Sequence, residues 1–391
     1  MSETENKQSK DRKFKLDFFS KKNLIIFSVT FIAVLLIFNS LLVSVDGLFS
    51  GLKYNIYTHD PGTSNIVYLD GIPYVDYGYK ENEYIGQQIS PTAMVREALD
   101  NLTIYYAENT SDSLDFCYKI ADWFLNNKII MSGPHWNNGT QLYYYMWAYN
   151  FSVSYPKKYI KGPWFSALAQ GHIIDLFEQL YQLTGNQTYR DAAVFSLNAM
   201  QIKIEERGLL IIEDTGKFWY PEVAEIYKPE SRRYILGGFL HTIQNLASVN
   251  NITDSIEMIN TISLLINYSI ANVKDKIIHY TYNDEWTYYD RLGNPTATNY
   301  HIRNTELIGW LFNYTNEPLF YYYWDKWSNT TYDQFPKNFG WYFITYFTET
   351  AKYWWFTLLY SLGLTVIAVL VYTFTEFLYQ RKTDPRKNKI N

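Results

Sequence analysis

The sequence predicts a mainly α protein, an incomplete (α/α) toroid of about four helix pairs flanked by one transmembrane helix at each end of the chain. The first observation behind this prediction is a helical period of apolar residues through residues 90–335, where short and long connections alternate. The second is a long uncharged run near each terminus. A length of 391 residues is enough for one large domain or two ordinary ones.

The uncharged runs extend from Leu24 to Val45 and from Tyr353 to Thr375, which are 22 and 23 residues. Each is long enough to cross about 30 Å of hydrocarbon as a helix. Basic residues precede the first run and follow the second, so we expect both termini in the cytoplasm and residues 46–352 outside the cell or in a lumen. The predicted segments are a basic tail over 1–22, transmembrane helices over 23–45 and 353–376, a juxtamembrane segment over 336–352 and a basic tail over 377–391.

Charge and composition exclude some functions for the central part of the chain, between the two uncharged runs. Residues 1–22 and residues 376–391 each carry a net charge of +3 and the whole chain carries −5, so the central part is close to −11. Such an acidic domain is a poor nucleic-acid binder. The 38 tyrosines suit carbohydrate clefts and membrane interfaces. Nine glycosylation sequons agree with a luminal or extracellular glycoprotein, at Asn101, Asn109, Asn138, Asn150, Asn186, Asn251, Asn267, Asn313 and Asn329.

In chain order, residues 46–89 are rich in Gly, Tyr, Asp and Pro and predict a stalk or a small β-element. Ser90-Pro91 then marks a helix start, because Pro is tolerated in the first helical turn. The period predicts helices near residues 90–106, 112–127, 165–183, 188–204, 233–249, 253–272, 300–313 and 316–328. Long aromatic connections between successive pairs should gather at one end and line a central cleft. A helical solenoid is the alternative, although no fixed sequence period supports it.

The stretch from Gly162 to Gly171 has the most specific choice of residues in the chain. Gly-Pro opens it, two large aromatic residues follow, and small residues stand at 166, 167 and 169. Small residues in a first helical turn allow a neighbouring backbone or a ligand to approach closely. Taken alone, the stretch predicts a tightly packed helix start.

The residues suggest no metal site, because the six His are scattered and the chain contains the single cysteine Cys117. His135 and His172 are interpreted as packing or hydrogen-bonding residues. A glycosidase that uses two carboxylates stays open, with Glu222, Glu225 or Asp290 as candidates. We expect neither a metal nor another cofactor.

Tyrosine chemistry is the other option that the connections offer. A phenol has a pKa near 10 and serves as a base only when cations or hydrogen bonds lower that pKa. Three tyrosines have such neighbours in sequence: Tyr227 with Lys228, Arg232 and Arg233, Tyr288 with Arg291, and Tyr300 with His301 and Arg303. For each of them, a packed aromatic role is the alternative.

These motifs resemble the C-terminal helical domain of D-glucuronyl C5-epimerases. The family motif reads Gly-Trp-Tyr-Ser-Ala-Met-Ala-Gln-Gly, and the stretch Gly162–Gly171 matches it with one extra residue, Pro163. The family order continues through Glu225-Ile226-Tyr227, Ile235–Phe239, Tyr288–Arg291 and Tyr300-His301, and the resemblance covers roughly residues 90–330.

The resemblance implies an enzyme that inverts C5 of a uronate within a polysaccharide, D-glucuronate to L-iduronate, without a cofactor. By motif matching, the catalytic residues are Tyr227, Tyr288, Tyr300, Arg291, Glu225 and His301. Candidate substrate-binding residues are Trp164, Gln170, Arg232 and Arg233. Arg291 is suited to a bidentate contact with the sugar carboxylate, which becomes doubly charged when the C5 proton leaves.

The chain also departs from the family pattern. The large β-rich N-terminal portion of the family is missing, Asn304 stands where the family has a second His, and the connection from Tyr288 to Tyr300 is shorter. The assignment of base and acid, the heparosan-like or other polymer, and a homodimer therefore stay open. Two alternatives remain, a polysaccharide lyase that begins with the same proton abstraction and a non-catalytic glycan-binding or assembly membrane protein.

Overall fold

The computed structural model describes most of the chain between residues 66 and 331 and parts of the terminal segments. The described ranges are 27–33, 66–80, 83–155, 158–226, 228, 234–282, 286–293, 296, 298–331, 362–363, 365–372 and 374–375. The chain divides into two compact units, 57–345 and a second one composed of 1–56 and 346–391. The larger unit contains the predicted helix pairs.

The membrane prediction concerns mainly the smaller unit. Most of the predicted spans 23–45 and 353–376, both basic tails and the juxtamembrane segment lie outside the described residues. Within the part of the chain that the structure describes, no helix has both the length and the apolar character needed to cross a membrane. The two spans and their orientation remain predictions.

A small β-element precedes the helices in the larger unit. Strands β1 (Ile66–Leu69), β2 (Ile72–Asp76) and β5 (Gln87–Gln88) form an antiparallel sheet in the order β1-β2-β5. Strands β3 (Tyr79–Lys80) and β4 (Glu83–Tyr84) pair beside it. Asp70 and Gly71 both have positive φ, at 51° and 73°, which is the backbone of a tight two-residue hairpin turn.

Eight helices follow, close to the predicted ranges: α3 (Pro91–Glu108), α4 (Ser111–Asn126), α5 (Ala167–Thr184), α6 (Gln187–Ala199), α7 (Leu236–Ile252), α8 (Ile256–Lys276), α9 (Thr298–Thr315) and α10 (Pro318–Thr331). Helix α6 ends at Ala199, earlier than the predicted 204. The chain leaves the helix there because Ile202 pairs with His135 and Lys203 with Leu210 in isolated bridges. A short 3₁₀ helix, η1 (Ile204–Glu206), replaces the last expected turn.

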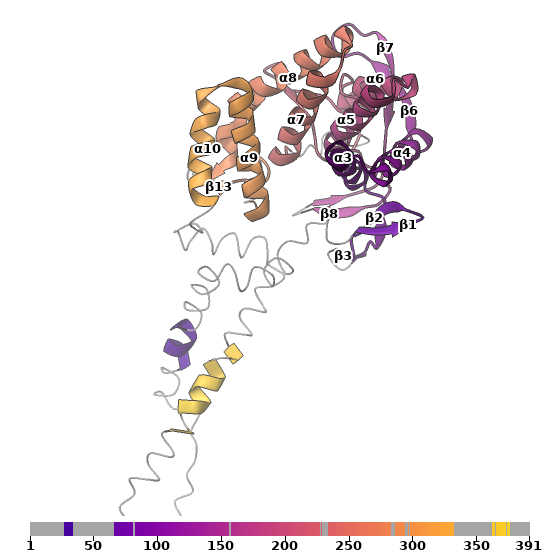
Figure 1. The fold of residues 1–391 in the computed structure, drawn as a ribbon. Coiled ribbons are helices and arrows are strands. Elements are labelled where there is room, and N and C mark those ends of the chain that lie inside the picture. The colour runs from indigo at the N-terminus through magenta and orange to yellow at the C-terminus, as the bar shows by residue number, and fades with distance from the viewer. Residues whose placement is uncertain are drawn as a thin grey trace, which may run out of the picture. The chain divides into compact units, whose positions relative to one another are not determined.

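The helices form two rows. Helices α3, α5, α7 and α9 contact one another in that order, and we name them the first row. Each is followed by a helix that packs back on it, α4, α6, α8 and α10, which make the second row (Figure 1). Since every pair is joined by a short connection, its members are antiparallel. Gly171 and Asp175 of α5 lie beside Asn245 and Ser248 of α7, so these two first-row helices run in the same direction. The larger described unit is therefore mainly helical.

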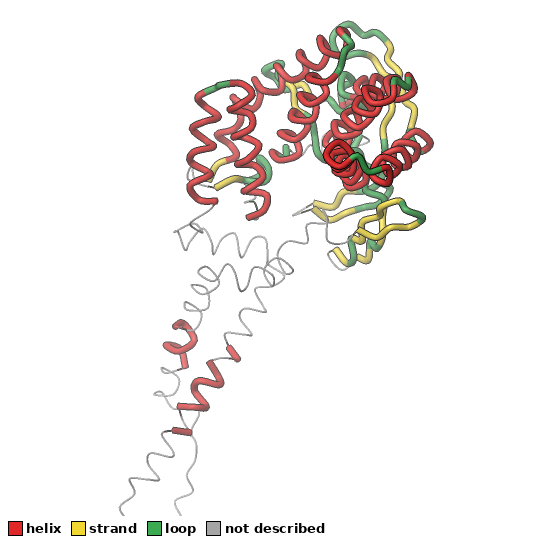
Figure 2. The backbone as a smooth tube through the Cα atoms, viewed as in Figure 1, coloured by secondary structure: helices red, strands yellow, loops and turns green. Residues whose placement is uncertain are grey.

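The long connections that lead into the later first-row helices contain hairpins, where the sequence pattern indicated only loops (Figure 2). Between α4 and α5 lie β6 (Ile129–Pro134), β7 (Gln141–Met146), β8 (Val153–Tyr155) and β9 (Lys158–Ile160). Strands β10 (Ile211–Ile212) and β11 (Phe218–Trp219) precede α7, and β12 (Thr281–Tyr282) and β13 (Trp286–Thr287) precede α9. Aromatic residues of these hairpins, such as Tyr144 and Trp219, are fully buried against the helices.

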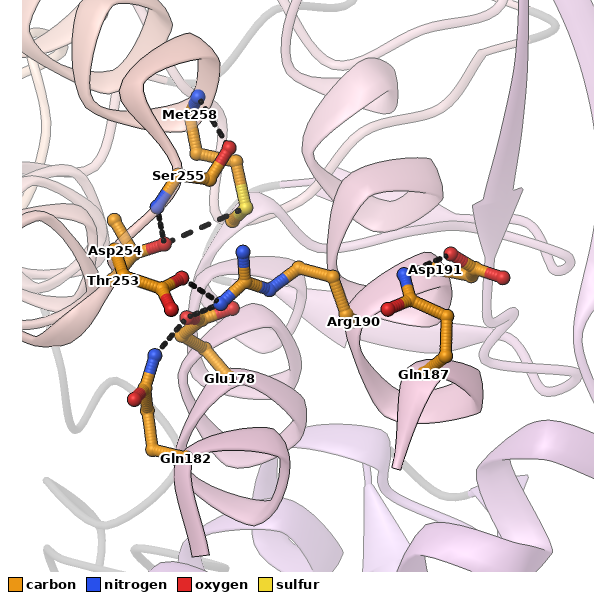
Figure 3. Close-up of polar contacts among 9 residues, drawn as sticks. All are labelled: Glu178, Gln182, Gln187, Arg190, Asp191, Thr253, Asp254, Ser255 and Met258. Carbon is orange, nitrogen blue, oxygen red and sulfur yellow. Dashed lines mark hydrogen bonds and ion pairs between the residues drawn. The ribbon is translucent and has the colours of Figure 1, made fainter. Parts of the chain in front are cut away.

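The short-connection end is held by a polar network around Arg190 of α6 (Figure 3). Nη2 of Arg190 lies 2.9 Å from Oε1 of Glu178 in α5 and 2.5 Å from Oδ1 of Asp254 in the α7–α8 connection. The Glu178 side chain is fully buried, and Gln182 donates to the same oxygen at 3.0 Å. A buried carboxylate needs such a partner, so this contact fixes α6 on α5.

Candidate functional site

The predicted motifs meet where first-row helices α5 and α7 begin. Phe165, just before α5, forms an antiparallel bridge with Ala224 of the α6–α7 connection. Ile235, just before α7, forms one with Asp290 of the α8–α9 connection. Each connection is thereby tied to the start of a neighbouring first-row helix. Segments that are far apart in sequence become neighbours at one end of the row.

Two glycines at the start of α7 explain how closely these segments pack. A Cβ on Gly238 would stand 2.3 Å from Oε2 and 2.5 Å from Cβ of Glu222, in the α6–α7 connection. A Cβ on Gly237 would stand 2.9 Å from Oδ1 of Asn304, in α9. A side chain at Gly238 would force Glu222 to shift, whereas one at Gly237 would have to displace only the tip of the Asn304 side chain, so glycine allows both neighbours to approach α7 closely.

Two of the three candidate tyrosines come from segments that touch. Tyr300 is the third residue of α9, and its ring contacts the ring of Tyr289 edge-on, with centroids 5.4 Å apart. The neighbouring Tyr288 donates its backbone N–H to the carbonyl of Tyr280 at 2.8 Å. Tyr288 and Tyr300 are both half-buried. The structure therefore brings the Tyr288–Arg291 segment beside Tyr300.

Arg291 is held in an ion pair within the protein. Its Nη2 lies 3.0 Å from both carboxylate oxygens of Glu213, and Nζ of Lys276 lies 3.8 Å from the same carboxylate. The guanidinium also stacks 3.9 Å above the ring of Tyr234. Burial acts to lower the pKa of Arg291, but the bond to Glu213 and nearby negative groups outweigh it, and the pKa is raised. Arg291 is therefore charged, and Glu213 neutralises much of that charge.

His301, which the family motif predicts to be catalytic, lies in the core of the domain. The residue is fully buried and its ring stacks on Trp286, with centroids 3.9 Å apart. Nδ1 accepts from the backbone N–H of Thr287 at 3.2 Å, and Nε2 lies 3.2 Å from the carbonyl oxygen of Trp327. A carbonyl only accepts, so Nε2 carries the proton. Burial lowers the pKa of His301 to about 4, so it is neutral near pH 7, and its contacts join α9, α10 and β13. Its catalytic role remains a prediction.

Trp164 and Gln170, the predicted substrate-binding residues at the start of α5, are both buried. The ring of Trp164 is 7% exposed and stacks on Tyr149, with centroids 3.8 Å apart. Gln170 is 2% exposed, and its amide donates to the carbonyl oxygens of Tyr145 and Ser196. Both side chains hold α5 against the preceding hairpins and the following helix. Their contact with a sugar remains a prediction.

The remaining candidates lie in the connection before α7. Glu225 is described and buried, 9% exposed, one residue after the bridge that ties this connection to α5. Tyr227, Arg232 and Arg233 lie outside the described residues. Their predicted roles remain predictions.

Sequence reasoning missed Glu213, which pairs with Arg291. The sequence gives little indication of this role, because an acidic residue close to the turn at Gly216 is typical of a solvated loop. The structure buries it instead, because hairpin β10–β11 packs on α8 and brings Glu213 to Lys276 and Arg291. For metal ions, the described residues contain no cluster of three or more His, Cys, Asp or Glu suited to bind one.

Comparisons with known proteins bear on this arrangement. A protein of Methanocaldococcus jannaschii described as "Uncharacterized protein MJ1128" is 25% identical over 309 residues, covering 75% of this chain and 96% of its own length. Among solved structures, the GH76 α-mannanase BT2949 of Bacteroides thetaiotaomicron has a TM-score of 0.40 and 11% identity, covering 76% of this chain and 70% of its own. The Lin0763 protein of Listeria innocua has a TM-score of 0.37 and 12% identity, covering 60% and 57%.

A family model covers the part of the chain that contains the motifs. The model is described as D-glucuronyl C5-epimerase C-terminus, and it matches residues 140–329. This range contains α5 to α9, most of α10 and every connection that carries a candidate residue. The resemblance to D-glucuronyl C5-epimerases is thus confirmed, and residues 140–329 are a domain of that C-terminal family.

Proposed function

We propose that the protein is a uronyl C5-epimerase that converts D-glucuronate to L-iduronate residues within a polysaccharide. The family match over residues 140–329 supports this proposal. The observation that carries it is the contact of Tyr289 with Tyr300, which puts two motif segments side by side at one end of the helix rows. We further propose that the two rows form part of an (α/α) toroid, with its cleft at that end.

The reaction is a proton exchange at one carbon. A base removes the proton from C5, the adjacent carboxylate becomes an enediolate with two negative charges, and an acid returns a proton from the opposite face. Base and acid therefore have to come from different segments. Tyr227, Tyr288 and Tyr300 belong to two connections and a helix start, which suits this requirement. Each accepts or donates the proton at its phenol oxygen.

Exchange with solvent tests the proposal. The full chain is incubated in deuterated water with a D-glucuronate polymer, and NMR measures deuterium at C5 and the appearance of L-iduronate. Tyr300→Phe should abolish the exchange, because it removes the ionisable oxygen and keeps the ring contact. Tyr321→Phe is the matched control, since Tyr321 is exposed on second-row helix α10.

Two results would contradict the proposal. Shortened chains with an unsaturated, ultraviolet-absorbing uronate would identify a lyase. Normal glycan binding without exchange, in the wild type and in Tyr300→Phe alike, would identify a non-catalytic binding protein.

We also propose that the domain acts outside the cytoplasm, attached to a membrane by the runs 24–45 and 353–375. Their lack of charge and their basic flanks support this proposal. Protease added to sealed vesicles should remove the tails and spare the domain when the tails face outward. Release of the intact chain by alkaline extraction would contradict membrane insertion.

A further inference from the structure

The folded domain exposes the nine glycosylation sequons to different degrees. A sequon acts through an asparagine that receives the sugar and a Ser or Thr two positions later. All three residues are exposed in Asn138-Gly139-Thr140 and in Asn186-Gln187-Thr188. In six other sequons at least one of the three residues is half-buried or buried. In the ninth, Nδ2 of Asn329 donates to the carbonyl oxygen of Asp325 at 2.8 Å.

Asn138 and Asn186 have the same local geometry. Oδ1 of Asn138 accepts from the backbone N–H of Thr140 at 3.0 Å, and Oδ1 of Asn186 accepts from that of Thr188 at 3.0 Å. In such an Asx turn the side chain uses its carbonyl oxygen. Nδ2, the atom to which a sugar is attached, has no hydrogen-bond partner among the described residues at either position. Attachment at Nδ2 would therefore break no contact within the described part of the domain.

Both asparagines lie in turns that the surrounding structure fixes. Asn138 is at the tip of hairpin β6–β7, where Gly139 has a φ of 72° and donates its N–H to the carbonyl oxygen of His135 at 3.0 Å. Asn186 is the N-cap of α6, and the ion pair of Arg190 holds the start of α6 on α5. The two acceptors are therefore held at the surface in defined positions.

Two other sequons show how the fold withholds an acceptor. Asn101 lies within α3, and its Nδ2 donates to the carbonyl oxygen of Glu97 at 2.8 Å. Asn267 in α8 is exposed, but Ser269 of its sequon is fully buried and donates its hydroxyl to the carbonyl oxygen of Leu265 at 2.8 Å. An enzyme that acts on the folded domain therefore meets only part of each of these sequons.

The two exposed sequons lie at opposite ends of second-row helix α6. Asn186 immediately precedes α6. The hairpin that carries Asn138 packs on α6 and is joined to the residues that follow this helix, because the N–H of Trp136 donates to the carbonyl oxygen of Gln201 at 3.0 Å (Figure 1). With 13 residues, α6 is about 20 Å long, so two attached oligosaccharides would be well separated.

We propose that the folded domain carries asparagine-linked oligosaccharides at Asn138 and Asn186, and none at Asn101 or Asn267. The inference rests on the proposed location of the domain outside the cytoplasm, and not on the epimerase reaction. Exposure of the whole sequon and the unoccupied Nδ2 are the observations that carry it.

The modification needs a donor and a transferase from the compartment that contains the domain. The donor is a lipid-linked oligosaccharide phosphate. Nδ2 of the asparagine forms a bond to C1 of the first sugar, the bond from C1 to the phosphate oxygen breaks, and the phosphate leaves with the electron pair. Nδ2 gives up one of its protons to the transferase or to water. Oδ1 still accepts from Thr140 or Thr188, so both turns persist.

Mass spectrometry tests the inference on the full chain purified from its source cells. Peptides that contain Asn138 or Asn186 should carry an oligosaccharide, and peptides that contain Asn101 or Asn267 should not. An unmodified Asn138 or Asn186 would overturn the inference. Equal modification of all four asparagines would also overturn it, because the fold would then make no selection.

Paired variants show whether each oligosaccharide depends on its sequon. Thr140→Val and Thr188→Val remove the hydroxyl of an exposed residue, and each should lose the oligosaccharide at its own site alone. Thr140→Ser and Thr188→Ser keep the hydroxyl and should retain the oligosaccharide. These surface changes should leave the melting temperature close to that of the wild type. Retention of both oligosaccharides in the folded valine variants would overturn the inference.

Protease added to sealed vesicles separates this inference from the proposed location. A protected domain without an oligosaccharide at either site would overturn the inference and leave the location standing. A digested domain without an oligosaccharide would reject both. Deuterium exchange at C5 reports on the epimerase reaction independently, since neither asparagine belongs to the candidate site.

Discussion

At the scale of single residues, Arg291 combines an ion pair with a stacking contact that an ammonium group cannot reproduce. One nitrogen meets both oxygens of Glu213, and the planar group stacks over Tyr234. We expect Arg291→Lys to lower C5 exchange at least tenfold, because lysine offers a point charge in place of a planar fork. Exchange rates and melting temperatures check this, with the exposed Arg207→Lys as the control. Near-normal turnover would remove Arg291 from the site.

His301 makes a prediction about pH. Its folded pKa of about 4 lies below the ordinary value of 6.5, so below pH 6.5 the unfolded chain binds a proton that the folded chain excludes. Stability from this group is complete above pH 6.5 and decreases as the pH falls toward 4. Between pH 7 and pH 4 the wild type should lose about 3 kcal/mol more unfolding free energy than His301→Gln.

Urea unfolding of both proteins at both pH values measures this difference. Asp175, whose burial raises its pKa to about 6, has the opposite sign and is common to both proteins. It therefore cancels in the comparison. An equal pH dependence in the two proteins would mean that His301 is not a buried neutral residue.

At this scale the sequence was a better guide to which segments lie together than to the contacts of each side chain. The order of Tyr288, Arg291 and Tyr300 follows the family motif, and the structure brings their segments together. The burial of His301 depends on Trp286, a residue 15 positions earlier that only the fold brings into contact. In the same way, Trp164 becomes a packing residue through its stack on Tyr149. Spacing along the chain contains no information about such contacts.

At the scale of elements, the neighbouring glycines Gly237 and Gly238 of α7 allow a matched comparison of two alanine variants. Alanine in a helix is favoured over glycine by about 1 kcal/mol, but at Gly238 its Cβ would meet Cβ of Glu222 at 2.5 Å. At Gly237 it would meet only the tip of Asn304. We expect Gly238→Ala to destabilise the fold by about 1–2 kcal/mol, because overpacking outweighs the helical preference.

Gly237→Ala should change stability by less than about 1 kcal/mol, since the Asn304 side chain can rotate away. Denaturant midpoints of the two variants check the contrast. If both variants were equally stable, the α6–α7 connection would not pack on the start of α7 as described. Loss of exchange in a stable Gly238→Ala variant would instead link this packing to function.

The helices themselves could be read from the sequence because their apolar faces repeat along each segment. The hairpins could not, since strands such as β10 and β11 are two residues long and show no alternation. The early end of α6 was missed for a related reason. Its cause is the pairing of Ile202 with His135, a contact between distant segments.

At the scale of the whole molecule, the two ends of the helix rows contain different groups of residues. The short-connection end carries the Arg190 network, and the long-connection end carries the motifs and the start of each first-row helix. The alternation of connection lengths predicted this division.

Because the motifs lie at only one end of the rows, the same insertion should affect C5 exchange differently at the two ends. Four Gly-Ser residues after Gly185 lengthen the exposed α5–α6 connection, and the same residues after the exposed Gly293 lengthen the segment between Arg291 and α9. Closing a longer surface loop costs little free energy, so both variants should melt close to the wild type. C5 exchange should survive the first insertion and fall at least tenfold with the second, because only the second separates Arg291 from Tyr300. Equal exchange in the two variants would show that the long-connection end is not the site, and loss of exchange in the first alone would place the site at the opposite end.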